Sequence, residues 1–538
     1  MKDMAAWNEG DWIAAIGALA LFATLAIGGV IATRRSAEVL GHPRGLFVLF
    51  YAEMWERFSY YGMRALLVLY LTKFWLFADG KANLIYGAYT SLVYITPVLG
   101  GTIADRWLGQ RKAVLFGGVM LALGHLFMAV EGAHGLTDPM AKQADPAINV
   151  FWLALALIIV GSGFLKANIS VIVGQLYRMT DLRRDGAYTI FYMGVNVGAA
   201  LGTILVGYLG ETIGWAWGFG LAGIGMILGL AIFVVGRPAL EGHGEPPAPL
   251  DSRHEWLLYG VGTASVAVIW ALVQWQDVIQ GLLIVAGAAM LAYTLYEASK
   301  LDKVARERIF AILFLIALNP VFWGLFEQAG GSLSLYTDRY VDRQGVPTSL
   351  FQAINPIYIV LLGPAFAALW AWLGRRGLEP SAPTKFAIAL MQVGLSFLVF
   401  TWGARGAGAA LTPVFYVFMI YLLQTTGELC LSPVGLSAMT RLAPLHLGSF
   451  IMGAWFYMSA VGNFVAGKIG EATGGESGEM SRELTLSIYG TIGWATLGIA
   501  AVMFLFAPVA RRWMHLEKLA GEEAERTARE ALDMPATT

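Results

Sequence analysis

The chain alternates long apolar runs with short polar connections from near its start to about residue 510. The runs are continuous, whereas barrel strands would alternate apolar and polar residues, so they predict membrane-spanning helices. Fifteen spans are predicted, at residues 12–33, 46–74, 83–104, 113–131, 150–173, 187–209, 215–236, 255–275, 277–299, 309–331, 352–373, 385–403, 412–437, 448–468 and 484–508. Only 14% of the residues are charged, against about 25% in soluble proteins. The pattern predicts an all-α integral membrane protein.

Clusters of basic residues predict the orientation of the spans. Alternate connections carry Arg34, Arg35 and Arg44; Arg106, Arg111 and Lys112; Arg178, Arg183 and Arg184; Lys300, Lys303, Arg306 and Arg308; Arg375 and Arg376; and Arg511 and Arg512. Cytoplasmic loops are rich in Lys and Arg, so this side and the C-terminal tail are predicted to be cytoplasmic. An odd number of spans then places the N-terminus outside. Positive charge follows the first span, which favours an uncleaved helix over a secretory signal.

The spans divide into two sets of six. The segment "GRPALEGHGEPPAPLDSRHEW" is rich in Pro, Gly and charge, which is typical of a solvated linker. The two spans after it carry little charge and are joined by a short turn, which indicates an inserted hairpin. The predicted organisation is an extra N-terminal helix at 1–44, six-helix bundles at 45–236 and 306–510, a linker with the hairpin at 237–305, and a tail at 511–538. Two-halved transporters commonly bind substrate between their halves, near the bilayer midplane.

The second span, "YAEMWERFSYYGMRALLVLYL", contains charges that are unfavourable in lipid. Each charged side chain facing hydrocarbon near a helix centre would cost about 2.5–3.5 kcal/mol. At 100° per residue, one face of this helix carries Glu53, Glu56, Arg57, Tyr60, Tyr61 and Arg64. That face must line a protein interior or a watery cavity. Ionisable groups in membranes are functional by default, and a static ladder of salt bridges is the alternative.

Further polar groups interrupt other spans. The charged ones are Lys166, Glu327 and Glu428, and the neutral ones include Asn196 and Asn355. An isolated buried asparagine is often a contact between helices instead of a ligand contact. Cations concentrate in the first half and two acids in the second, which suits a ligand with one carboxylate and one ammonium. An additional acid could carry a proton, because burial favours a neutral carboxyl group. The residues therefore indicate a proton-linked carrier of small zwitterions.

Other residues and the overall charge narrow the function. A net charge of −1 argues against a nucleic-acid partner, and the single cysteine, Cys430, excludes an intramolecular disulfide. His125 is interpreted as a core histidine with its hydrogen bonds satisfied. The sequence shows no metal-ligand cluster, nucleophile elbow or phosphate-binding loop, which argues against a membrane enzyme. No cofactor is expected, and protons would be the coupling ion.

Four motifs resemble those of the proton-dependent oligopeptide transporter family, a branch of the major facilitator superfamily. "EMWERFSYYG" matches the family motif E-x-x-E-R-F-x-Y-Y-G at every defined position. "FYMGVNVGAALG" and "GELCLSPVGLS" are similar to its fifth- and tenth-helix signatures, and "GGTIADRWLGQRK" matches a loop motif of the superfamily. The resemblance covers residues 45 to 510. It implies two six-helix bundles and the hairpin usual in bacterial members; the helix at 12–33 departs from that form.

The resemblance also implies roles for individual residues. Arg57, Lys166, Tyr61 and Tyr94, with Tyr60 beside them, would meet a peptide carboxylate, and Glu428, Asn196 and Asn355 would meet its ammonium group. Glu53, Glu56 and Lys166 would form the proton site. Arg64 would pair with Glu327 to close the outer side, and Lys166 with Glu428 to close the inner side. Trp323, Phe326, Trp455 and Ser459 would line side-chain pockets, although the aromatic residues could equally be core packing.

The function implied is proton-coupled import of di- and tripeptides by alternating access between the two bundles, in the plasma membrane or inner membrane. One alternative is a related carrier of another small anion or a peptide-like compound. A membrane enzyme or a sensor without transport remains as a further alternative.

Overall fold

The computed structural model describes residues 38–178, 181 and 183–518, and within them the chain is almost entirely helical. Thirteen helices of the described part are long and apolar enough to cross a membrane. Helix α2 (Arg44–Lys73), which carries the charged stripe, is a further helix of 30 residues. Every predicted span from the second onward therefore has its helix. The predicted first span, 12–33, and the external N-terminus lie outside the described residues.

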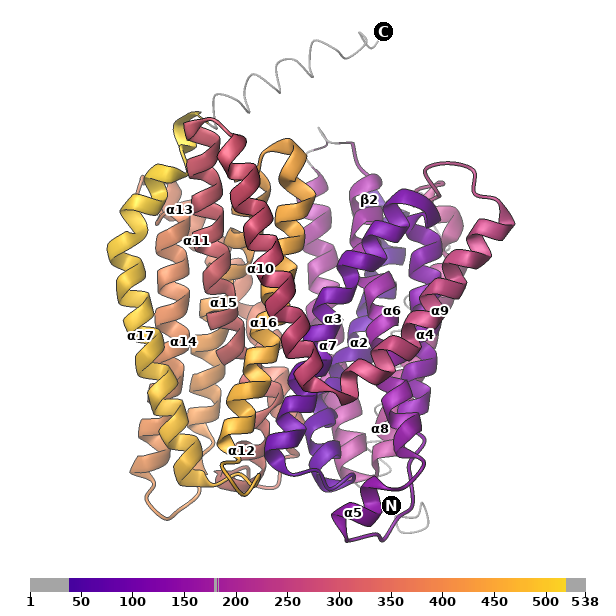
Figure 1. Cartoon of the computed structure of the whole chain (residues 1–538), viewed down its shortest axis with the longest axis vertical. Helices are drawn as coiled ribbons and strands as arrows, with labels where there is room; N and C mark the ends of the chain where they lie inside the picture. Colours follow the sequence, from indigo (N-terminus) through magenta and orange to yellow (C-terminus); the bar gives the residue numbers. More distant parts are fainter. Residues whose placement is uncertain (1–37, 179–180, 182, 519–538) are drawn as a thin grey trace.

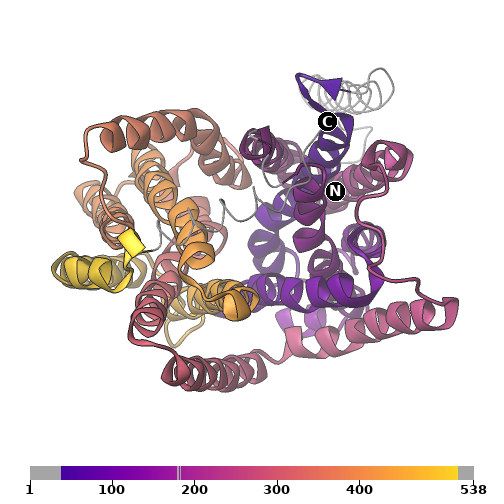
Figure 2. The same cartoon turned by 90° about the horizontal axis from the view of Figure 1, so that it is seen from above.

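The long helices form two bundles that lie side by side (Figures 1 and 2). The N-terminal bundle contains α2, α3 (Asp79–Ile103), α4 (Gln110–Met128), α6 (Ile148–Gln175), α7 (Arg183–Thr212) and α8 (Trp215–Val235). The C-terminal bundle contains α11 (Lys303–Phe326), α13 (Ile354–Arg375), α14 (Ala382–Gly406), α15 (Phe415–Leu442), α16 (Gly448–Thr473) and α17 (Arg482–Trp513).

Short elements connect the long helices. They are α5 (Pro139–Gln143), α12 (Ser332–Tyr340), the π-helical turn η2 (Ala104–Leu108), and the 3-10 turns η3 (Arg237–Leu240), η4 (Glu327–Gly330), η5 (Thr348–Ala353) and η6 (Leu445–Leu447). Strands β1 (Glu38–Val39) and β2 (His42–Pro43) pair antiparallel, and β3 (Val341–Asp342) and β4 (Thr412–Pro413) pair parallel.

The predicted span at 309–331 is too long. Helix α11 ends at Phe326, and Glu327 begins a 3-10 turn that leads through Gly331 into α12. Gly331 adopts φ −114° and ψ −111°, which interrupts the helical path. The apolar character of the residues on both sides hid this break from a hydrophobicity pattern. As a consequence, Glu327 lies at a helix end, where a side chain can reach the other bundle.

The inserted hairpin consists of α9 (Ser252–Gln274) and α10 (Gln276–Lys300), with only Trp275 between them. Helix α9 packs on the N-terminal bundle, where the Lys112 Nζ lies 2.7 Å from the Glu255 Oε2. Helix α10 runs along the C-terminal bundle, and the Tyr457 hydroxyl donates a hydrogen bond to the Leu283 carbonyl. The hairpin thus lies across one face of both bundles (Figures 1 and 2).

Helices α3 and α16 make a close contact between the two bundles. A Cβ atom built on Gly87 would lie 2.5 Å from the Cα atom of Gly467, and one built on Gly467 would lie 2.9 Å from the Cα of Gly87. Only glycine fits at such a distance, and small residues commonly let membrane helices approach this closely. The backbones of the two bundles therefore touch at this crossing.

Polar contacts join the two bundles at the end of the molecule where α2 ends and α3 begins. The Arg339 guanidinium donates to both carboxylate oxygens of Asp79, at 2.5 and 2.6 Å. The Lys73 Nζ lies 2.8 Å from the Asp338 Oδ1. The Glu211 carboxylate accepts from the backbone N–H groups of Thr348 and Ser349, both at 2.9 Å. Together these contacts hold that end closed.

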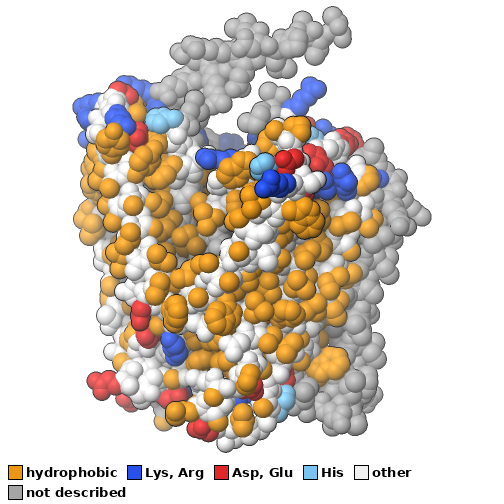
Figure 3. Space-filling model, turned by 45° about the vertical axis from the view of Figure 1, so that its right-hand side comes forward, with side chains coloured by type: hydrophobic (Ala, Val, Ile, Leu, Met, Phe, Trp, Pro, Cys, Tyr) orange, Lys and Arg blue, Asp and Glu red, His pale blue; other side chains and the backbone are white. Residues whose placement is uncertain are grey.

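The opposite end carries most of the basic connections. Lys and Arg side chains gather there, and the surface is notched between the two halves of the molecule (Figure 3). The basic clusters of the sequence, such as Arg111 with Lys112 and Arg375 with Arg376, belong to the connections at this end. The bundles are thus closed at the end poor in basic residues and parted at the basic end.

Candidate functional site

The charged face of α2 is buried inside the N-terminal bundle. Glu53, Glu56 and Arg57 are 2%, 0% and 5% exposed. The Arg57 Nε donates to the Glu53 Oε1 at 2.7 Å and lies 3.1 Å from the Glu56 Oε2. One oxygen of Glu53, Oε2, has no hydrogen-bond partner among the described residues. One guanidinium therefore serves two buried acids, so a competing anion at Arg57 would leave an acid without its counter-ion.

Lys166 of α6 lies close to this cluster. Its Nζ is 4.0 Å from the centre of the Tyr94 ring and 6.0 Å from that of Tyr60. The charges of Glu53 and Glu56 act on its ammonium group, yet within the described part of the chain Lys166 forms no salt bridge. The side chain is half-buried. The Lys166 ammonium group thus lies near two aromatic rings, and its positive charge is available to a ligand.

The acid of the C-terminal bundle is held by amide and hydroxyl groups. The Asn355 Nδ2 donates to the Glu428 Oε2 at 3.0 Å and to the Thr425 Oγ1 at 3.0 Å. Glu428 is half-buried and, among described residues, has no cation within salt-bridge distance. Asn196 instead donates to the Tyr192 carbonyl of its own helix at 3.0 Å. The structure thus brings together Asn355 and Glu428, but it joins neither Asn196 nor Lys166 to Glu428.

A second ion pair connects the two bundles below the cluster. The Arg64 guanidinium donates to the Glu327 carboxylate, and its Nε donates to the Tyr86 hydroxyl at 2.6 Å. Both charged side chains are buried, at 7% and 2% exposed. The Tyr61 and Tyr86 rings lie 5.5 and 5.8 Å from the guanidinium. The predicted pairing of Arg64 with Glu327 is therefore present, on the side where the bundles are closed.

Glu327→Gln is expected to destabilise the protein, because it leaves the Arg64 charge buried without its counter-ion. Breaking a buried pair in this way costs about 3–5 kcal/mol of folding free energy. Thermal unfolding of the purified protein would measure the effect. Lys73→Gln is the matched control: the Lys73 side chain is 41% exposed, so loss of its pair with Asp338 should cost at most about 1 kcal/mol. Equal shifts in the two variants would contradict the expectation.

The residues predicted to line side-chain pockets lie in different environments. Trp455 and Ser459 are each 4% exposed and are packed within the C-terminal bundle. Trp323 is half-buried, its ring lies 5.1 Å from that of Phe326, and its Nε1 has no hydrogen-bond partner within the described chain. Of this group, Trp323 is the better placed to meet a ligand in this conformation.

Two contributors to the site escaped sequence reasoning. The Asn319 Nδ2 donates to the Trp455 carbonyl at 3.2 Å and to the Ser459 Oγ at 3.0 Å, which fixes α11 against α16. The Asn-Pro pair within an apolar run was the available signal. Tyr86, the hydrogen-bond partner of Arg64, gave no such signal because a tyrosine in a helix usually packs in the core.

The interpretation of His125 is wrong in one respect. The side chain is completely buried in α4, as predicted for a core histidine. Neither of its ring nitrogens, however, has a hydrogen-bond partner among the residues described. The sequence shows that the residue is inside but not which groups surround it.

Comparison with known proteins connects this geometry to a family. The profile "PTR2: POT family" matches residues 111–477. The "Peptide transporter YePEPT" of Yersinia enterocolitica subsp. palearctica is 36% identical over 511 residues, which cover 88% of this chain and 96% of the relative. The "Di-/tripeptide transporter" of Lactococcus lactis is 34% identical over 466 residues, covering 80% and 89% of the two chains.

Solved structures agree with the sequence relatives. The crystal structure of a peptide transporter POT in complex with sulfate superposes with a TM-score of 0.77 at 34% identity, and the match covers 89% of this chain and 97% of that one. A POT family transporter in complex with 5-aminolevulinic acid gives a TM-score of 0.75 at 30% identity, with coverage of 89% and 99%. The predicted major facilitator fold is confirmed, and the relatives are transporters, not enzymes. This chain is a multi-pass membrane protein that belongs to the POT family of transporters.

Proposed function

We propose that this protein imports di- and tripeptides together with protons. The observation that supports this most strongly is the separation of unpaired charge between the bundles. Lys166 in the N-terminal bundle and Glu428 in the C-terminal bundle are both half-buried and, in the part of the chain that is described, neither forms a salt bridge. A peptide offers the complementary pair of charges, a carboxylate and an ammonium. Relatives named di- and tripeptide permeases support the same substrate class.

The N-terminal bundle would bind the peptide carboxylate. Arg57 and Lys166 supply positive charge, and Tyr61 and Tyr94 supply hydroxyl groups at partly exposed positions beside them. Tyr60 lies next to Tyr61, with ring centres 5.2 Å apart, and is buried. A guanidinium binds carboxylates through two parallel hydrogen bonds, which adds directional preference to the attraction of charge.

The C-terminal bundle would bind the peptide ammonium. Glu428 presents a carboxylate that Asn355 already orients through a hydrogen bond of 3.0 Å. Asn196, which donates within its own helix here, would contribute its side-chain carbonyl after the bundles move together. Trp323, Trp455 and Ser459 would then surround the side chains of the peptide.

The shared guanidinium supports proton coupling. When a peptide carboxylate binds to Arg57, it competes with Glu53 and Glu56 for the same N–H groups. An acid that loses its counter-ion while buried favours its neutral, protonated form. The positive charge of Lys166 disfavours protonation of Glu53 or Glu56. Movement of Lys166 toward Glu428 would remove this effect, and the acid could then take up a proton. Peptide and proton would in this way enter together.

The orientation of the chain would decide which end of the molecule faces the cytoplasm, and the inward proton gradient would drive import. The basic end and the C-terminal tail would face the cytoplasm, because Lys and Arg are retained on that side of a membrane. The closed end, with Arg64 and Glu327, would then face outward, and the structure would correspond to an inward-facing state in the plasma or inner membrane. Opening of the Arg64–Glu327 pair would admit peptide from outside.

Uptake into proteoliposomes tests this proposal. Labelled dialanine should accumulate when the external solution is made acidic, and unlabelled dialanine should compete whereas nitrate and single amino acids should not. Accumulation without a pH gradient, or stronger competition by nitrate, would favour the alternative of a carrier for another small anion. Peptide-like compounds should be included, because crystal structures of relatives contain alafosfalin and 5-aminolevulinic acid.

The ammonium contact gives a prediction of its own. N-acetyl-dialanine lacks the positive charge that Glu428 would bind, so it should compete with labelled dialanine at least about tenfold less well than dialanine does, which corresponds to about 1.4 kcal/mol. In Glu428→Gln the difference between the two competitors should shrink. Competition in proteoliposomes measures both quantities, and thermal unfolding checks that the variant is folded. Equal competition by the two peptides in the unaltered protein would refute the role of Glu428.

A further inference from the structure

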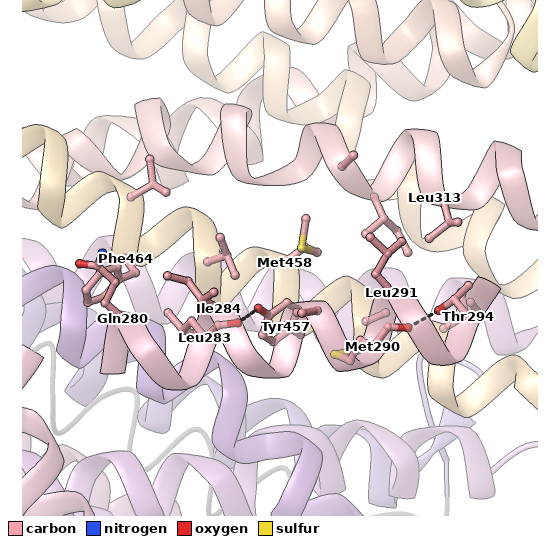
Figure 4. A pocket seen from close by; sticks show the side chains of 18 of the residues that line it. Gln280, Leu283, Ile284, Met290, Leu291, Thr294, Leu313, Tyr457, Met458 and Phe464 are labelled. Atoms are coloured by element: carbon pink, nitrogen blue, oxygen red, sulfur yellow. Dashed lines mark hydrogen bonds between the residues drawn. The ribbon is translucent and has the colours of Figure 1, made fainter. Parts of the chain in front are cut away.

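The cavity shown in Figure 4 lies away from the charged site, between α10 of the hairpin and helices α11 and α16. Its volume is about 840 Å³, and its lining is almost entirely apolar. Gln280 and Phe464 lie at one end, and Thr294 and Leu313 lie at the other (Figure 4). We call this space the lateral groove. It occurs where a membrane protein faces lipid, so its occupant must suit a hydrocarbon environment.

The groove exists because few side chains hold α10 against the bundle. The Tyr457 hydroxyl reaches across to the Leu283 carbonyl, and the rings of Tyr293 and Phe450 meet with centres 4.9 Å apart. Between these two contacts α10 carries Gly287, where a Cβ atom would lie 2.6 Å from the Tyr457 hydroxyl oxygen. Tyr457 thus spaces the helices, and the small residues of α10 leave the remaining volume unfilled by protein.

The length of the groove along α10 fits within the thickness of the hydrocarbon layer. The lining residues of α10 extend from Gln280 to Thr294, about 21 Å at 1.5 Å per residue, within a bilayer core of about 30 Å. Ile284 and Leu291 are 64% and 50% exposed at its mouth. At this depth the exposed apolar surface meets acyl chains instead of water. A lipid chain is therefore the occupant that both the shape and the surroundings favour.

One end of the groove carries charge of both signs. Lys468 lines the groove near the end of α16, and its Nζ lies 3.0 Å from the Glu471 Oε2. The two side chains are 36% and 42% exposed, so both can reach the headgroup layer. A phosphate would pair with the lysine, and a positively charged choline or ethanolamine would pair with the glutamate. This pair of charges complements a zwitterionic headgroup better than an anionic one.

We propose that the lateral groove binds one zwitterionic phospholipid of the leaflet at the closed end, with an acyl chain between α10, α11 and α16 and the headgroup at Lys468 and Glu471. Tyr457 and Met458 face the groove, and the neighbouring Trp455 and Ser459 are packed inside the bundle on the same helix. The lipid would therefore support the outer face of the helix whose inner face carries candidate site residues.

Retention of lipid through detergent extraction tests the site. Cys430→Ser removes the single cysteine, and Ala317→Cys then places a fluorescent bimane label in the groove. Ala501→Cys is the matched control, an exposed alanine of α17 at a similar distance from the basic end, about 18 Å against 21 Å. Each protein is reconstituted in vesicles of dibrominated phosphatidylcholine, whose bromine atoms quench bimane, and is then purified in mild detergent.

Both labels should be quenched in vesicles, but only the label at 317 should remain quenched after extraction. Ala288→Trp, which adds bulk to the lining, should abolish the retained quenching, whereas Ala289→Trp, at a neighbouring exposed position outside the lining, should not. Equal recovery of fluorescence at 317 and 501 would refute the lipid site. It would also be refuted if a second copy of the chain covered the groove, since the label at 317 would then escape quenching in vesicles.

A second comparison tests the headgroup assignment. Lys468→Ala should weaken retention of brominated phosphatidylcholine by up to about fivefold, as expected for loss of one exposed charge contact. In the unaltered groove, brominated phosphatidylglycerol should be retained less well than phosphatidylcholine, because Glu471 repels a headgroup with net negative charge. Equal retention of the two lipids, or no effect of Lys468→Ala, would refute the placement of a zwitterionic headgroup at this end.

Discussion

Glu53→Gln is expected to separate peptide binding from accumulation. Glutamine keeps the shape of a protonated glutamic acid but cannot release a proton, so the proposed proton site would be fixed in one state. The variant should bind dialanine and exchange it across the membrane in counterflow. It should not raise the internal concentration above the external one when only a pH gradient or a membrane potential is imposed.

Two further variants define the result. Glu56→Gln should behave similarly, since the Glu56 Oε2 lies 3.1 Å from the same Arg57 Nε. Glu245→Gln, in the linker at the basic end where Arg111 pairs with the acid, should retain accumulation and serves as the control. If Glu53→Gln concentrates dialanine as well as the unaltered protein does, Glu53 is not required for coupling. The charged face of α2 would then be a static ladder of salt bridges with a structural role, which is the alternative that the sequence left open.

Arg57→Lys should impair transport severely although it conserves the charge. In the structure Arg57 contacts Glu53 and Glu56 through Nε, and its terminal Nη2 lies 2.7 Å from the Glu53 Oε1. An ammonium group cannot reproduce this planar arrangement or a two-bond contact with a peptide carboxylate. Loss of one hydrogen bond to a charged group corresponds to about 1.5–3 kcal/mol, so peptide affinity should fall about 10- to 150-fold.

Equilibrium binding of labelled dialanine measures that effect directly. The control is Arg376→Lys, because Arg376 is exposed on a basic connection and its guanidinium lies 4.2 Å from the centre of the Trp372 ring, away from the charged site. Its peptide affinity should be unchanged. Near-normal affinity in Arg57→Lys would show that charge alone is sufficient at position 57, and the carboxylate contact would have to be assigned elsewhere.

From the second span onward, the sequence was sufficient to predict the helices because a membrane makes their signal strong. Every backbone polar group in hydrocarbon must be satisfied within the segment, so long apolar runs have few alternatives to a helix. The buried charges of α2 were equally readable, since a charged residue in such a run has to face inward. The same reasoning located Glu327, whose ion pair with Arg64 is present in the structure.

Contacts between distant segments could not be predicted in this way. Nothing near Asp79 in the sequence indicates that Arg339 and the Met480 N–H meet its carboxylate. Asn319 shows the same limit, because its partners lie 136 and 140 positions away. The lateral groove depends on how α10 stands against α16, which the apolar pattern of either helix leaves open. Side-chain packing between helices therefore determines what hydrophobicity alone does not.

The contact between Gly87 of α3 and Gly467 of α16 lies nearer the closed end of the molecule than the basic end. From Gly467, α16 extends about 9 Å to Thr473 at the closed end and about 28 Å to Gly448 at the basic end. From Gly87, α3 extends about 12 Å to Asp79 and about 24 Å to Ile103. If the bundles rock about this fulcrum, the basic end moves about two to three times as far as the closed end. A small separation of Asp79 from Arg339 would therefore be enough to close the opening between the two bundles at the basic end.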